Sequence, residues 1–141
     1  MLKRVHHINF VVRDLEAAIK HYRSVLAVDS FEILEHPHRP VKTARFQLDG
    51  TWIVLVQPLD NESAPAQHLQ KHGEGFFLIS YEVDDIDHAI QHVKDNDGIL
   101  VDETSRPGIL NWQVADLDSE NCYGATVQLV EEKKIPPEPE D

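Results

Sequence analysis

A histidine and an amide alternate with apolar residues near the start of the chain, in the segment 5–12, VHHINFVV. Successive side chains of a strand point to opposite faces, so His7 and Asn9 would share one face, with His6 and Ile8 on the other. An imidazole titrates near neutral pH and can act as a general acid or base. We therefore predict that His7 is a catalytic residue and that Asn9 contacts the same ligand.

The same alternation, applied to the other predicted strands, adds polar side chains to this face. They are Arg45, Trp52, Ser80, Thr126 and Gln128. Polar groups in a mostly apolar cavity must be paired or must meet a ligand, and their density favours a ligand pocket over a wet core. Trp52 and Phe76 offer flat surfaces for an aromatic or acyl group. The prediction is a small-molecule site.

One segment, 5–27, must position His7, and it is predicted to form a strand followed directly by a helix. Asp14 stands where an N-cap residue should be, and apolar residues follow at helical spacing. The unit recurs in the segment 77–94, where Asp85 stands 71 residues after Asp14. The sequence therefore predicts an internal duplication.

Further predicted strands complete each half of the duplicated chain. Strands are predicted at 29–34, 41–48 and 52–57 in the first half, and at 99–102, 112–117 and 125–131 in the second. Asp49-Gly50 is a hairpin signal, 66–72 is a connecting helix, and 106–108 is a loop. Each half then reads as a strand, a helix and three strands, which is an α+β fold. The tail 133–141, rich in proline and acidic residues, is expected to be disordered.

Composition narrows the classes of partner. The 141 residues carry a formal net charge of -12, which disfavours binding to nucleic acid or to an anionic membrane. No apolar run reaches the ~20 residues of a membrane span, and no signal peptide is recognisable. The single cysteine, Cys122, cannot form an internal disulfide, so we expect a cytoplasmic protein.

The paired βαβββ modules resemble the vicinal-oxygen-chelate superfamily, which includes glyoxalases, bleomycin-resistance proteins and dioxygenases. The segment Gln57-Pro58-Leu59 and the run 63–90, SAPAQHLQKHGEGFFLISYEVDDIDHAI, most resemble the methylmalonyl-CoA epimerases. The resemblance covers residues 5–131. It implies one domain over residues 1–132, built from modules 5–58 and 75–132 that form a cup-shaped mixed sheet. It also implies a ligand in the cup and a homodimer.

Members of this superfamily usually hold one divalent metal in the cup. Its ligand positions correspond here to His7, Val54, Leu78 and Gln128. Because two of the four are apolar, we expect no metal or other cofactor, with a divalent metal held by His7 and Gln128 as the alternative. The epimerases carry a catalytic acid or base near the loop 36–40, and His38 lies at about that place.

Two functions follow. The first is a metal-independent isomerase, epimerase or lyase acting on a small carbonyl compound or acyl thioester, with His7, Gln128 and His38 as catalytic residues. The second is a bleomycin-resistance-like protein that sequesters a small molecule without chemistry. His7 and the epimerase-like middle region favour the enzyme, whereas the lost metal ligands favour the binding protein. The substrate is left open.

Overall fold

The computed structural model describes residues 1–134, so most of the predicted disordered tail lies outside the described residues. The chain forms two compact units. The N-terminal unit is Val5–Ile79, and the C-terminal unit combines Met1–Arg4 with the chain from Ser80 onward. The chain passes from one unit to the other inside strand β5, Gly75–Glu82. No helix within residues 1–134 is long and apolar enough to cross a membrane.

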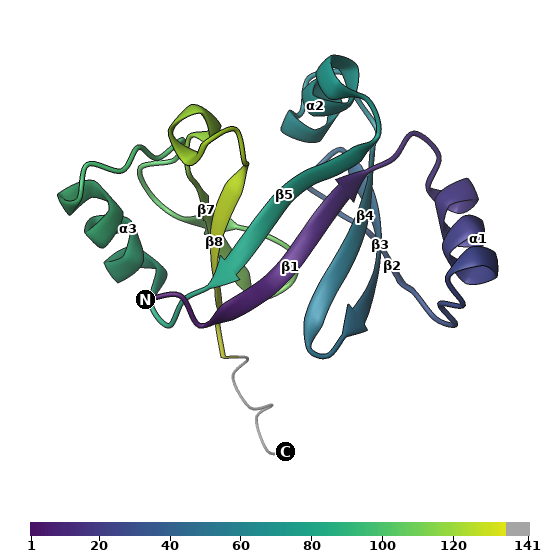
Figure 1. Ribbon diagram of the computed structural model, residues 1–141, viewed down its shortest axis with the longest axis horizontal. Coiled ribbons are helices and arrows are strands. Elements are labelled where there is room, and N and C mark those ends of the chain that lie inside the picture. Colours follow the sequence, from purple (N-terminus) through teal and green to yellow (C-terminus); the bar gives the residue numbers. More distant parts are fainter. Residues whose placement is uncertain (135–141) are drawn as a thin grey trace. The chain divides into compact units, whose positions relative to one another are not determined.

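The N-terminal unit contains the first module and the connecting helix (Figure 1). Its elements are β1 (Arg4–Val11), α1 (Leu15–Val25), β2 (Glu32–Glu35), β3 (Val41–Leu48), β4 (Thr51–Pro58) and α2 (Ala64–His72). The strand order is β2-β3-β4-β1-β5, with β1 parallel to β4 and β3 antiparallel to both of its neighbours. The hairpin between β3 and β4 turns at Asp49 and Gly50, which both have positive φ, as predicted.

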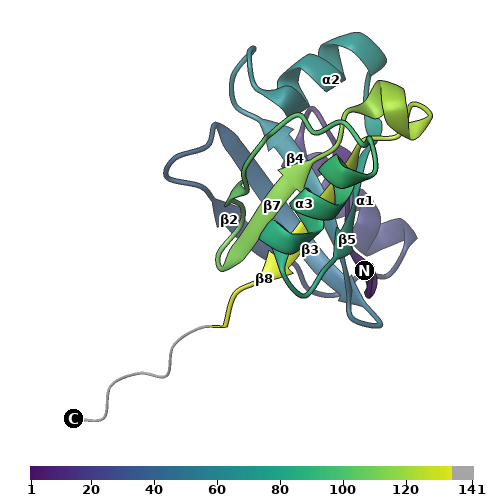
Figure 2. The ribbon, with the colours of Figure 1, turned by 90° about the vertical axis from the view of Figure 1, so that its left-hand side faces the viewer.

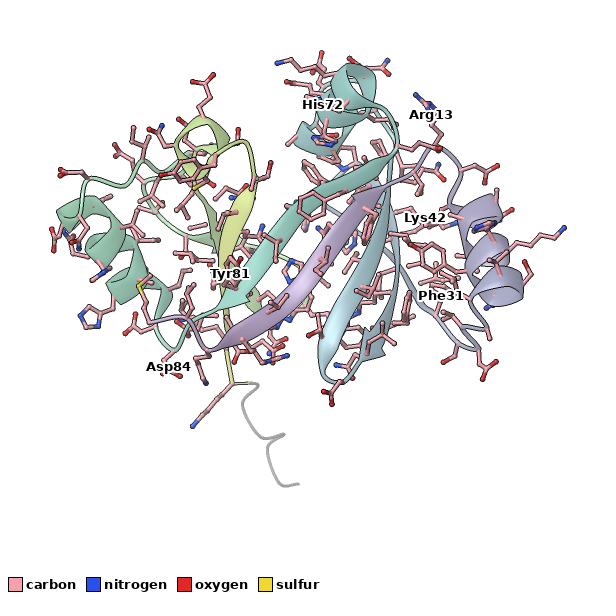
Figure 3. All side chains as sticks on the ribbon, in the orientation of Figure 1. Arg13, Phe31, Lys42, His72, Tyr81 and Asp84 are labelled. Atoms are coloured by element: carbon pink, nitrogen blue, oxygen red, sulfur yellow. The ribbon has the colours of Figure 1, made fainter. Side chains whose placement is uncertain are left out.

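Helix α1 begins where the sequence predicts, because the Asp14 carboxylate accepts a hydrogen bond from the Ala17 N–H. The helix buries Leu15 and Ile19 against the sheet. Phe31 lies beside the helix in Figure 3. A second cluster of buried residues contains Val11, Val41, Val54 and Val56, and Leu69 of α2 packs against it. Along β1, the predicted site residues His7 and Asn9 alternate with residues that face helix α1.

The C-terminal unit repeats the strand-helix-strands pattern. After β5 come α3 (Ile86–Asp95), β6 (Arg106–Pro107), β7 (Trp112–Asp116), a short 3₁₀ helix (Ser119–Cys122) and β8 (Val127–Glu132). The strand order is β5-β8-β7-β6, and α3 lies against β7 and β8 (Figure 2). Asp85 caps α3 as Asp14 caps α1, by accepting from the His88 N–H. The predicted α+β fold of two βαβββ modules is therefore confirmed.

One predicted strand is wrong. The segment 99–102 forms no strand; Leu100 makes a single isolated bridge to Leu117. The strand of this region is β6, at the predicted loop, and it contains only Arg106 and Pro107. Ile99 and Val101 are 49% and 66% exposed, whereas Leu100 between them packs against the core of this unit, so one side chain of the segment holds it near the sheet. The proline lacks an N–H group, which suits a short strand at the edge.

Candidate functional site

His7 lies on β1 beside Trp52 of β4 and is 3% exposed. Its Nδ1 lies 2.8 Å from the Nδ1 of His6, which is fully buried. In such a hydrogen bond one nitrogen donates and the other accepts, so the two rings share one proton between them. The sequence places His6 on the opposite face, where it would be independent of His7. That expectation is wrong, because the two rings turn toward each other.

Asn9, two residues further along β1, pairs in register with Val54. Its Oδ1 atom is buried and has no hydrogen-bond partner among residues 1–134. A buried carbonyl oxygen without a partner costs about 1–3 kcal/mol of desolvation. A ligand that donates a hydrogen bond to Asn9 would recover this energy, so the amide suits its predicted ligand-binding role.

Arg45 and Trp52, both predicted to contact a ligand, are in direct contact. The guanidinium carbon lies 3.8 Å from the centroid of the Trp52 ring, and Nη2 donates to Glu32 Oε1 at 3.0 Å. The Arg45 side chain is only 5% exposed, whereas the Glu32 side chain is 45% exposed. All three residues line a pocket of about 540 Å³ that also takes in the connection from α1 to β2.

The loop after β2 carries two histidines, of which the exposed one is His38. His36 is part-buried instead, with its Nε2 3.1 Å from the Thr43 Oγ1. Burial lowers the pKa of His36, and the positive charges of Arg39 and Arg45 lower it further. His36 was not predicted as a site residue from the sequence. The feature that could have indicated it is Thr43, its hydrogen-bond partner, which lies on the same strand face as Arg45.

Phe76 is the second residue of β5 and is 46% exposed. Its ring meets the ring of Phe10 edge-on, with 6.2 Å between centroids. Phe10 itself packs against the cluster under α1. The Phe76 ring is therefore accessible, and the Phe10 ring supports it from one side.

The C-terminal unit holds the other three predicted residues. Ser80 is fully buried and donates to the Gln128 Oε1 at 3.0 Å. The Gln128 Nε2 donates in turn to the Asp116 Oδ1, also at 3.0 Å. Thr126 is half-buried and stands just before β8. Asp116 was not predicted, because only the β7–β8 register places it opposite Gln128.

These residues do not fit the divalent metal site that the resemblance implies. Val54 and Leu78, at two ligand positions, are buried apolar side chains with no atom that coordinates a metal. The Gln128 carboxamide is engaged at both ends. A structural or catalytic metal requires three or more protein ligands, so this ligand set is incomplete.

Comparisons with known proteins agree with the fold. Residues 6–115 match the family model described as the Glyoxalase/Bleomycin resistance protein/Dioxygenase superfamily. The mitochondrial methylmalonyl-CoA epimerase of Bos taurus is 30% identical over 91% of this chain and 74% of its own. An ethylmalonyl-CoA/methylmalonyl-CoA epimerase of Cereibacter sphaeroides is 34% identical over 67% of this chain and 72% of its own.

Solved structures give the same picture. A methylmalonyl-CoA epimerase in complex with methylmalonyl-CoA and NH4+ superimposes with a TM-score of 0.84 at 25% identity, covering 94% of this chain and 96% of that one. The methylmalonyl-CoA epimerase from Mycobacterium tuberculosis gives a TM-score of 0.86 at 25% identity, covering 94% and 90% of the two chains. The similarity therefore extends through both modules.

Proposed function

This chain belongs to the Glyoxalase/Bleomycin resistance protein/Dioxygenase superfamily, and we propose that it is an epimerase acting on an acyl-CoA thioester of the substituted-malonyl type. One observation carries the proposal. The 30% identity to a methylmalonyl-CoA epimerase spans 91% of the chain rather than a single motif. Because the family metal ligands are not all present, we propose chemistry that uses the side chains alone.

The reaction requires removal of the proton on the carbon between the two carbonyl groups and its return to the opposite face. His7 suits the removal step, because a neutral imidazole accepts a proton; the proton that arrives on the opposite face comes from a donor on that face, such as solvent. Its hydrogen bond to His6 supports both forms, since a proton can sit on either Nδ1. His7 is thus our candidate for the general base.

The pocket at Arg45 suits the negative charge of such a substrate. Arg45 is buried and bound to Glu32, whose own side chain is nearly half exposed. A substrate carboxylate could take the place of the Glu32 carboxylate without leaving the guanidinium unpaired. The Trp52 ring beneath it adds apolar contact area.

A binding protein that does no chemistry is the second candidate. Val54 and Leu78 favour it, because they remove the metal that would stabilise an enolate in this superfamily. The pocket at Arg45 would then hold a small molecule without turning it over.

A single epimer of methylmalonyl-CoA distinguishes these functions when its conversion is followed by chiral chromatography. We expect conversion by the native protein and a loss of about 10²-fold or more in His7→Ala. The exposed His21→Ala is the control and should retain the native rate. Binding by calorimetry without conversion would establish the binding protein instead. The absence of both conversion and binding would overturn the acyl-CoA proposal.

A further inference from the structure

Four side chains of the N-terminal unit share one face of its sheet, and they include the candidate base and a cation. Trp52 and Val54 are two residues apart on β4, so both point to the same face. His7 of β1 stands in register with Trp52, and Arg45 of β3 stands in register with Val54. Because directly opposite residues of paired strands point to the same face, His7 and Arg45 flank one short stretch of β4.

Val54 is a position at which the superfamily places a metal ligand, and a positive charge of another kind lies next to it. The Arg45 guanidinium is buried over the Trp52 ring, with its carbon 3.8 Å from the ring centroid. Arginine stays charged throughout the physiological pH range. A metal stabilises an enolate by its positive charge, and hydrogen bonds from a buried guanidinium can do the same in a site shielded from water.

A ligand can reach this cation. Arg45, Trp52 and Glu32 line the pocket of about 540 Å³, which is within the range of small-molecule sites. The Glu32 carboxylate accepts from the Arg45 Nη2 at 3.0 Å. Glu32 belongs to the edge strand β2 and its side chain is 45% exposed, so it can turn into solvent and leave its place to another anion.

Charge decides between Glu32 and a substrate of the malonyl type. Glu32 carries one negative charge. The substrate carries one on its carboxylate and gains a second on the thioester oxygen as its proton leaves. The attraction to Arg45 therefore grows during the reaction, which is what distinguishes catalysis from binding. The two carbonyl carbons are attached to one carbon, so an oxygen of each can accept from the planar guanidinium.

We propose that Arg45 is a catalytic residue that supplies the positive charge for which this superfamily uses a metal, and that Glu32 is the counter-ion that the substrate displaces. The C–H bond breaks, its proton passes to His7, and its electron pair moves to the thioester oxygen, which faces Arg45. The pair then returns to form a new C–H bond with a proton from a donor on the opposite face. The catalytic role rests on the proposed function, whereas the displacement of Glu32 does not.

Malonate, titrated by calorimetry into the full chain, tests the displacement. Glu32→Gln should bind malonate about tenfold more tightly than the native protein, because no carboxylate of the chain then competes for Arg45. Glu35→Gln is the matched control, since this exposed carboxylate of the same strand lies by Lys42 instead, and its affinity should stay within about twofold of native. No binding by Glu32→Gln, or equal affinities in the two variants, would overturn the counter-ion role.

Deuterium incorporation into methylmalonyl-CoA tests the catalytic role. Arg45→Ala should lower kcat about 10²-fold or more, and methylguanidine at millimolar concentration should restore about tenfold by filling the space over Trp52. The native protein, whose site is occupied, should not be accelerated by methylguanidine. A raised KM with unchanged kcat would mean that Arg45 binds substrate and transition state equally, and it would overturn the proposal. So would the absence of rescue in an Arg45→Ala protein with a native circular dichroism spectrum.

The two titrations separate this inference from the proposed function. If the native protein neither binds methylmalonyl-CoA nor exchanges its proton, the acyl-CoA function fails, and the catalytic role of Arg45 fails with it. The malonate titration still decides whether Glu32 is a displaceable counter-ion. If methylmalonyl-CoA is exchanged at the native rate by Arg45→Ala, the proposed function stands and the role of Arg45 alone is overturned.

Discussion

At the scale of residues, alternation along a strand locates side chains but does not say which of them touch. It correctly predicts that Arg45 and Trp52 share a face, and the structure stacks the two. It fails for His6, because the rings of His6 and His7 lie within hydrogen-bond distance although the two positions alternate along the strand. It also misses Asp116, whose partner depends on the register of β7 against β8. Register is a property of paired strands and cannot be predicted from the sequence of either strand alone.

The contact between the rings of His6 and His7 determines the expected effect of removing His7 on stability. His7→Ala takes away the hydrogen bond at the Nδ1 of His6, a fully buried group, and leaves a cavity. We expect the free energy of unfolding to fall by about 1–3 kcal/mol, as measured by urea denaturation. His21→Ala, at an exposed position, should lie within about 0.5 kcal/mol of the native protein. An unchanged stability in His7→Ala would show that the His6–His7 hydrogen bond contributes nothing.

At the scale of elements, the internal duplication allows the metal-ligand positions of the two modules to be compared in the sequence. Leu78 stands in β5 where His7 stands in β1, and Val54 lies opposite Asn9 in β4. The first strand of each module thus carries one ligand position, and only one of the two is occupied by a ligating residue. The absence of a metal cofactor stays a prediction.

Restoring the missing ligands tests this assignment. Val54→Glu combined with Leu78→His adds a carboxylate and a second imidazole to His7 within the N-terminal unit. We expect this double variant to bind one Ni²⁺ per chain in a calorimetric titration. Val54→Glu combined with Ile79→His is the matched control, because Ile79 points to the opposite face of β5. Equal nickel binding by the two variants would mean that the ligand positions are misassigned.

Helix α2 is attached to β5 by a group that titrates. The His68 Nε2 donates to the Phe76 carbonyl oxygen at 3.0 Å. Burial lowers the pKa of His68 below 6.5, the nearby His72 lowers it further, and the bond to Phe76 opposes the shift. The folded state then binds fewer protons than the unfolded state, so this contribution to stability is present above pH 6.5 and is lost as the pH falls below it.

Thermal unfolding measured between pH 7.5 and pH 5 should therefore show a smaller loss of stability in His68→Gln than in the native protein. His21→Ala serves again as the control and should follow the native curve. Parallel curves for His68→Gln and the native protein would contradict the assignment of this pH dependence to His68.

At the scale of the whole molecule, the order of elements was predictable because each signal was local. Caps at Asp14 and Asp85, the Asp49-Gly50 turn and the helical periodicities all lie where the structure has them. The error at 99–102 arose because a short apolar segment can run beside a sheet without joining it. The homodimer and the cytoplasmic location stay predictions, as does the extent of the domain over 1–132.

The central claim is that this chain epimerises an acyl-CoA thioester through its own side chains. The most direct measurement is the incorporation of solvent deuterium at the carbon between the carbonyl groups of methylmalonyl-CoA, followed by mass spectrometry in D₂O with an excess of EDTA. We predict incorporation well above the spontaneous rate, equal with and without the chelator, and reduced about 10²-fold or more in His7→Ala. Incorporation no faster than the spontaneous rate, or incorporation that EDTA abolishes, would contradict the claim.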